Sequence, residues 1–168
     1  FSMDASASEI LAWEPQGIML SNGPGDPSAM DDTAELIKEL LGSDIPIFGI
    51  CLGHQLLSMA SGLTTYKMHN GHRGINHPVK NLITGKCEVT SQNHGFVVDK
   101  KSAESREDIE ITHVHLNDDT LAGIRIKNKP AFSVQFHPES SAGPNDSRYL
   151  FDEFVELITA NKAQTIEA

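Results

Sequence analysis

Apolar residues in the first 62 positions form two kinds of pattern. Two short apolar runs, at 17–20 and 45–50, predict buried strands. The first run breaks into a loop rich in Gly and Pro, and the second leads directly into a helical pattern. Apolar residues with helical spacing predict three helices, at about 6–13, 31–41 and 51–61. Strands that alternate with helices in this way predict an α/β fold with parallel strands.

The second half of the chain has short β-rich runs separated by turns. These runs lie at 77–81, 86–91, 95–99, 109–116, 121–127 and 131–136. Helical spacing returns at about 146–161, which predicts a final amphipathic helix. We find no internal repeat and no linker. The pattern therefore predicts one α/β domain of three layers, whose open sheet is mostly parallel and becomes mixed in the β-rich second half.

Composition narrows the class of protein. The 168 residues suit one domain, and 23 acidic against 13 basic residues give a formal net charge of −10, so no nucleic-acid partner is expected. No run reaches the roughly 18 apolar residues of a membrane span, and the first residues show no signal-peptide pattern, so no membrane partner is expected. The two cysteines, Cys51 and Cys87, are too few for a disulfide framework and favour the cytoplasm.

Cys51 lies where the second predicted strand meets a helix, in the sequence Gly49-Ile50-Cys51-Leu52-Gly53. This is the pattern of a nucleophile elbow, in which a tight turn exposes the reactive side chain. The start of the helix would favour the thiolate, and the N–H of Leu52 can serve as an oxyanion donor. The alternative is a small buried cysteine between packing glycines. Cys87 lies in a β-rich run and is interpreted as a packing residue.

His137 and Glu139 follow the last predicted strand directly. Residues two apart in extended backbone project to the same side, and Pro138 favours that conformation for His137. Glu139 can therefore accept a hydrogen bond from the His137 ring and fix its tautomer. With Cys51, these residues supply a nucleophile, a base and a group that orients the base. The alternative for this segment is a surface turn.

The other histidines are candidates for a metal site or a second base. Some spacings that metal sites use occur among His69, His72, His77, His113 and His115. No cysteine or carboxylate cluster completes a ligand set, so no metal is expected. His54, one turn into the helix after Cys51, is a possible alternative base, but a packing or hydrogen-bonding role is favoured.

Two polar segments can border a small ligand. The loop at 22–27 fits neither of the common phosphate-binding glycine motifs, and no Lys follows it. Its glycines are therefore interpreted as bringing backbone N–H groups to a ligand, one of them as the second oxyanion donor. The segment at 91–96 joins two β-rich runs and carries several polar groups. Plain turns are the alternative for both.

Two motifs together, Gly49-Ile50-Cys51-Leu52-Gly53-His54-Gln55 and Phe136-His137-Pro138-Glu139, resemble the class I, triad-type glutamine amidotransferase domain. Three further segments, at 20–27, 71–79 and 92–96, look most like the small subunits of glutamine-hydrolysing carbamoyl-phosphate synthases. The similarity runs from about residue 6 to residue 160. The resemblance implies that Cys51 attacks the side-chain amide of glutamine, and that His137, backed by Glu139, moves the protons.

The resemblance also implies which residues contact glutamine. The oxyanion hole would be formed by the backbone N–H groups of Gly23 and Leu52. The glutamine contacts would be Gly23, Gly25, Leu52, Gln55, Asn93, Gly95 and Phe96. Ammonia would pass to a large synthetase subunit, on which ATP and Mg are expected, and no cofactor is expected in this chain. The carbamoyl phosphate formed there feeds pyrimidine and arginine synthesis.

The chain departs from this family in two ways. Family small subunits carry an N-terminal domain that has no counterpart here, and their amidotransferase domain opens with a strand, a helix and another strand that this chain lacks. Residues 1–168 are thus expected to be an amidotransferase domain without its first strands. The alternatives are the amidotransferase component of anthranilate or aminodeoxychorismate synthase, a non-catalytic fragment that binds a partner, and another thiol hydrolase.

Overall fold

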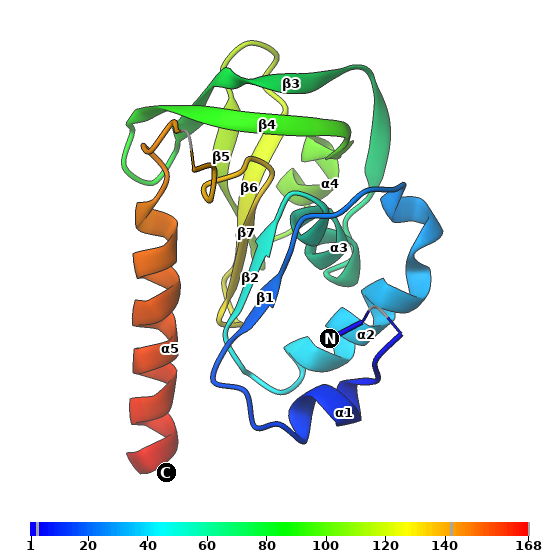
Figure 1. Ribbon diagram of the computed structural model, residues 1–168, viewed down its shortest axis with the longest axis vertical. Helices are drawn as coiled ribbons and strands as arrows, with labels where there is room; N and C mark the ends of the chain where they lie inside the picture. Colours follow the sequence, from blue (N-terminus) through cyan, green and yellow to red (C-terminus); the bar gives the residue numbers. More distant parts are fainter. Residues whose placement is uncertain (3, 142, 168) are drawn as a thin grey trace.

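Seven strands form one mixed sheet in the order β1-β2-β7-β6-β5-β3-β4 (Figure 1). The computed structural model describes residues 1–2, 4–141 and 143–167. The strands are β1 (Ile18–Leu20), β2 (Ile47–Ile50), β3 (Thr65–Asn81), β4 (Cys87–Val98), β5 (Ile109–His115), β6 (Leu121–Ile126) and β7 (Ala131–Val134). The helices are α1 (Ala7–Leu11), the 3₁₀ turn η1 (Pro27–Ala29), α2 (Asp31–Leu41), α3 (Leu52–Ala60), α4 (Lys100–Glu104) and α5 (Tyr149–Glu167).

Among the described residues, parallel pairing joins three strands, β1, β2 and β7. β1 pairs with β2, and β2 with β7, in parallel, whereas the strand pairs from β7 to β4 are antiparallel. The predicted α/β class with a mixed sheet is confirmed, but the expectation of a mostly parallel sheet is wrong, because four of the six strand pairings are antiparallel. The β-rich second half of the chain supplies these antiparallel strands. Because β2 and β7 are parallel neighbours, the residues that follow them emerge at the same edge of the sheet.

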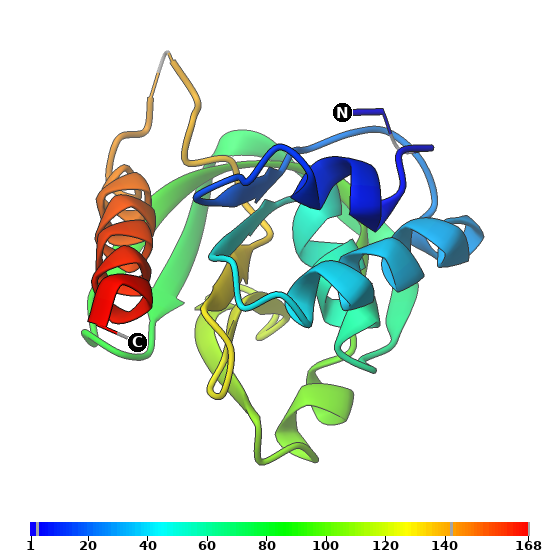
Figure 2. The same ribbon diagram turned by 90° about the horizontal axis from the view of Figure 1, so that it is seen from below.

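Helices cover both faces of the sheet. α1, α2 and α3 lie on one face and α5 lies on the other (Figure 2). Strand β2 shows the alternation, since Ile47 packs in the core under α1–α3 and Phe48 packs in the core under α5. The Phe48 ring stacks on Phe132 of β7 with ring centroids 4.5 Å apart and contacts Phe154 of α5 at 5.7 Å. Within the described part of the chain, none of the helices combines the length and apolar character needed to cross a membrane.

Strands β3 and β4 are longer than the sequence pattern predicts. β3 begins at Thr65, well before the predicted run at 77–81. β4 runs without a break from Cys87 to Val98, so the interpretation of 91–96 as a loop between two strands is wrong. Register shifts between Lys67 and His72, and between Gly74 and His77, interrupt the pairing of β3 with β4. The short helix α4 was also not predicted.

Candidate active site

Cys51 forms the tight turn between β2 and α3. Its backbone has φ 53° and ψ −103°, a conformation that a residue with a side chain rarely adopts. A Cβ atom on Gly49 would lie 2.7 Å from the Gly53 carbonyl oxygen, and one on Gly53 would lie 2.2 Å from the Leu20 carbonyl oxygen. Strand and helix therefore approach too closely for side chains at both glycines, and the turn has the geometry that a nucleophile elbow requires.

The Cys51 thiol sits at the N-terminus of α3 among polar groups. Its Sγ atom lies 3.7 Å from Gln135 Nε2 and 3.9 Å from the Asn93 carbonyl oxygen. Leu52 is the first residue of α3, where backbone N–H groups have no partner within the helix. Both cysteines are free thiols, but Cys87 is exposed on β4 and has no comparable surroundings. Only Cys51 is thus placed for nucleophilic chemistry.

His137 and Glu139 follow β7 and form a hydrogen-bonded pair. His137 Nδ1 donates to Glu139 Oε1 at 2.8 Å, since a carboxylate can only accept. The backbone N–H of His137 donates to the Ser91 carbonyl oxygen at 2.8 Å, which ties this segment to β4. The other ring nitrogen, Nε2, is buried without a hydrogen-bond partner among the described residues. The neighbouring Cys51, and then Glu139, raise the pKa of His137 to about 10, so the ring readily carries a proton.

A cleft of about 250 Å³ opens beside Cys51. It is lined by every residue expected to contact glutamine, namely Gly23, Gly25, Leu52, Gln55, Asn93, Gly95 and Phe96. His137 and Glu139 are not among the residues that line the cleft. Two basic side chains, Lys67 and Arg73 of β3, also line the cleft and were not predicted. These cations suit a ligand that carries a carboxylate.

Gln135 is a further site residue that the sequence analysis missed. Gln55 Nε2 donates to the Phe96 carbonyl oxygen at 2.8 Å and to Gln135 Oε1 at 3.0 Å, and Gln135 Nε2 in turn reaches the Cys51 sulfur. Both amide protons of Gln55 are therefore used within the protein, which leaves its Oε1 atom as the acceptor for a ligand. The available signal was position, because Gln135 lies two residues before His137 in an extended segment.

His54 has the packing role that the sequence favoured. Its side chain is fully buried, and Nδ1 lies 2.8 Å from the Ser133 hydroxyl of β7. Burial lowers the pKa of His54 to about 3, so the ring is neutral at physiological pH. His54 therefore links α3 to the sheet.

The histidines considered as metal ligands do not gather around Cys51. His69 is exposed, and His113 hydrogen-bonds Tyr149 through Nε2 at 3.0 Å. His72, His77 and His115 lie together, with ring centroids between 4.0 and 5.3 Å apart. This second group is separate from the thiol.

The fold is shared with known proteins. A protein described as a putative GMP synthase component, from Thermoplasma acidophilum, superimposes with a TM-score of 0.79 at 20% identity, over 97% of this chain and 81% of that chain. A glutamine amidotransferase from Thermotoga maritima superimposes with a TM-score of 0.64 at 20% identity, over 91% of this chain and 66% of that chain. At this level of identity the likeness concerns the fold alone.

Sequence similarity extends the likeness beyond the fold. Carbamoyl phosphate synthase small chains from Staphylococcus saprophyticus and Bacillus cereus are 55% and 56% identical to this chain, over 163 and 155 residues. The alignments cover 97% and 92% of this chain but 44% and 42% of the relatives, so the chain spans less than half of their length. The family model described as "Glutamine amidotransferase class-I" matches residues 1–157, and the chain therefore belongs to the class-I glutamine amidotransferase family.

Proposed function

We propose that this chain is the glutamine-hydrolysing part of a carbamoyl-phosphate synthase and that Cys51, His137 and Glu139 are its catalytic triad. One observation carries the proposal: the Cys51 thiol stands on a strained elbow beside the cleft, next to a histidine whose pKa is raised and whose Nε2 atom lacks a partner among the described residues. A nucleophile, a proton carrier and a carboxylate that orients the carrier are the groups that amide hydrolysis by a thiol needs.

The chemistry follows from the positions of these groups. The Cys51 thiolate attacks the side-chain carbonyl carbon of glutamine, and backbone N–H groups of Gly23 and Leu52 donate to the oxyanion that forms. His137 gives its Nε2 proton to the leaving nitrogen, so ammonia departs and a thioester remains on Cys51. His137 then takes a proton from water, whose oxygen attacks the thioester carbon. Glutamate leaves, and the thiolate and imidazolium are restored.

The cleft supports glutamine as the ligand. Gln55 Oε1 is free to accept from an α-ammonium group, and the Lys67 and Arg73 side chains can attract an α-carboxylate. Asn93, Gly95 and Phe96 border the same space from β4. A zwitterion with an amide at its far end matches this arrangement, with the amide directed to Cys51.

The relatives named carbamoyl phosphate synthase small chain support the destination of the ammonia. We infer that the partner is a large synthetase subunit, on which ATP and Mg²⁺ act, and that the carbamoyl phosphate enters pyrimidine and arginine synthesis. The same relatives favour this assignment over an anthranilate or aminodeoxychorismate synthase. The two free thiols suit a reducing compartment, the cytoplasm.

The test uses the full-length protein in complex with its large subunit. Cys51→Ser should abolish carbamoyl phosphate synthesis from glutamine and leave synthesis from added ammonia intact. Cys87→Ser is the matched control, because it makes the same change at the exposed cysteine, and it should preserve both activities. Glutamine-dependent synthesis by Cys51→Ser would contradict the proposal. Loss of both activities would instead make Cys51 a structural residue.

A further inference from the structure

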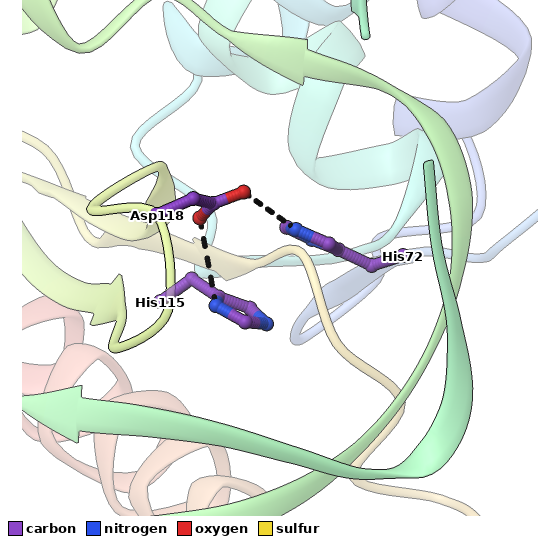
Figure 3. A group of neighbouring side chains, drawn as sticks. All are labelled: His72, His115 and Asp118. Atoms are coloured by element: carbon purple, nitrogen blue, oxygen red, sulfur yellow. Dashed lines mark hydrogen bonds and ion pairs between the residues drawn. The ribbon is translucent and has the colours of Figure 1, made fainter. Parts of the chain in front are cut away.

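A second cluster of polar side chains lies where β3 approaches the end of β5. His72, His115 and Asp118 each offer one ligand atom, and these atoms lie within 4.8 Å of one another (Figure 3). The two rings are stacked with centroids 4.0 Å apart, and both residues are buried. Asp118, from the turn after β5, has a carboxylate that is partly exposed. The spacing of the histidines in the sequence does not point to Asp118, which the fold brings to them.

His72 directs a lone pair at this carboxylate. Its Nδ1 atom lies 3.2 Å from both Gln92 Oε1 and His94 Nε2. His94 donates from Nδ1 to the Phe96 carbonyl oxygen, and burial lowers its pKa to about 4, so its Nε2 atom is an acceptor and His72 Nδ1 carries the proton between the two rings. The Gln92 amide is oriented because its Nε2 donates to the Thr90 hydroxyl, which donates to the His77 carbonyl oxygen. In the neutral ring, Nε2 is then an acceptor 2.8 Å from Asp118 Oδ2. Two acceptors that close require a proton or a cation between them.

His115 directs a second lone pair at the same carboxylate. Its Nδ1 atom accepts the backbone N–H of Asn117 at 3.2 Å and is therefore unprotonated, and it lies 3.5 Å from Asp118 Oδ1. Its Nε2 proton is directed to His77 Nδ1 at 3.0 Å. A bound metal ion would take the Nδ1 lone pair of His115, and this coordinate bond would replace the 3.2 Å hydrogen bond from the Asn117 N–H. In each ring the nitrogen that faces away from Asp118, which is Nδ1 of His72 and Nε2 of His115, is hydrogen-bonded to a neighbouring side chain, as in metal-ligating histidines.

We propose that His72, His115 and Asp118 form a binding site for a divalent ion of the Zn²⁺ class. Two imidazole nitrogens and one carboxylate oxygen are a zinc donor set, whereas Mg²⁺ and Ca²⁺ prefer oxygen ligands. Zinc bonds of about 2.0–2.1 Å place two tetrahedral ligand atoms about 3.3 Å apart. The 2.8 Å from His72 Nε2 to Asp118 Oδ2 and the 3.5 Å from His115 Nδ1 to Oδ1 lie on either side of that value, and they end on the two different oxygens of the carboxylate, either of which can be the ligand. The exposed side of Asp118 leaves the fourth position to water.

The ion would join two elements that the sheet pairs only loosely. Strand β3 pairs with β5 through Val79–Asn81, but the part of β3 around His72 lies between two register shifts. Hydrogen bonds also connect the cluster to the cleft. His72 Nδ1 lies 3.2 Å from His94 Nε2, and His94 Nδ1 donates to the carbonyl oxygen of Phe96, which lines the cleft. The bound ion therefore steadies the β3–β4 wall of the cleft without taking part in the thiol chemistry.

Metal titration of the full-length protein tests this proposal. All chains carry Cys51→Ser, so that the thiol cannot be a ligand, and Zn²⁺ affinity is measured by competition with a chromophoric chelator. Asp118→Asn keeps an acceptor oxygen for Thr120 and removes the charge, and it should weaken binding by about 100-fold or more. Asp119→Asn is the matched control one residue further on and should bind as the parent does. Bound Co²⁺ should show no charge-transfer band from sulfur.

The outcomes separate a metal site from an ion pair. Equal affinities for Asp118→Asn and Asp119→Asn would overturn the proposal. Absence of a bound ion in the parent chain would do the same, and a proton on His72 would then account for its contact with Asp118. If Asp118→Asn does not fold, His115→Asn takes its place, because its amide oxygen can still accept from Asn117. A folded His115→Asn chain with unchanged affinity would also contradict the site.

Discussion

The parallel and antiparallel halves of the sheet place polar side chains in different ways. In the parallel half, β2 and β7 end side by side, and the residues just beyond them, Cys51 and His137, emerge at one edge. In the antiparallel half, the polar residues lie inside the strands, where His72 and His115 are buried. Strand direction decides the first arrangement, whereas hydrogen bonds between side chains decide the second. Changes to the backbone should therefore matter most in the parallel half, and changes to hydrogen-bonding groups in the antiparallel half.

The largest effect is expected on the rate of glutamine hydrolysis when His137 is replaced. His137→Gln removes the proposed proton carrier but keeps a group that can hydrogen-bond Glu139, and it should lower kcat for glutamine hydrolysis by about 10²- to 10⁴-fold. His69→Gln, at an exposed histidine of the antiparallel half, should leave kcat unchanged. Both rates are measured on the full-length protein with the proposed synthetase partner. A small effect of His137→Gln would show that another group moves the proton.

The second prediction compares how a Gly→Ala substitution changes stability in the two halves of the sheet. Gly53→Ala places a Cβ atom 2.2 Å from a backbone oxygen that cannot move freely, so it should reduce the free energy of unfolding by about 3 kcal/mol. Gly95→Ala in β4 meets only the end of the Arg73 side chain, at 3.8 Å, and should change it by less than about 1 kcal/mol. Urea unfolding of both variants provides the measurement. Equal losses would mean that the elbow is not tightly packed.

The difference between the parallel and antiparallel halves also explains which features of the fold and site the sequence predicts. The elbow glycines and the His137–Glu139 spacing are local signals, and parallel strand ends bring them together. The pattern divides β4 into two runs because its buried face carries polar side chains. These buried residues are Glu88, Thr90, Gln92 and His94. The alternation of buried and exposed positions is present, but it is not an alternation of hydrophobic and polar residues.

Gln135 and Asp118 were missed for a related reason. Each is a common polar residue without a motif, and its partners are distant in the sequence: Gln55 for Gln135, and His72 for Asp118. The first half of β3 has few buried residues, so no hydrophobic pattern marks it as a strand. Local conformation is thus readable from the sequence, whereas polar contacts across the sheet require the fold.

The smallest of the three effects concerns a buried histidine of the parallel half. The pKa of His54 is lowered to about 3 by burial, so the unfolded chain binds a proton below pH 6.5 that the folded chain does not. Its contribution to stability is therefore complete above pH 6.5 and falls as the pH decreases toward 3. Between pH 7 and pH 5, His54→Gln should lose about 2 kcal/mol less than the parent chain. The free energy of unfolding of both chains is measured by chemical denaturation at several pH values. If it falls equally with pH in both, the loss of stability in acid arises from groups other than His54.

The central claim is that Cys51 is the nucleophile that attacks glutamine, and covalent capture tests it most directly. The full-length protein is treated with a glutamine analogue that carries an electrophilic carbon in place of the amide, and the adduct is mapped by mass spectrometry. We predict one adduct, on Cys51, whose formation excess glutamine prevents, and none on Cys87. Modification of Cys87 instead, or modification of Cys51 that glutamine does not slow, would contradict the account.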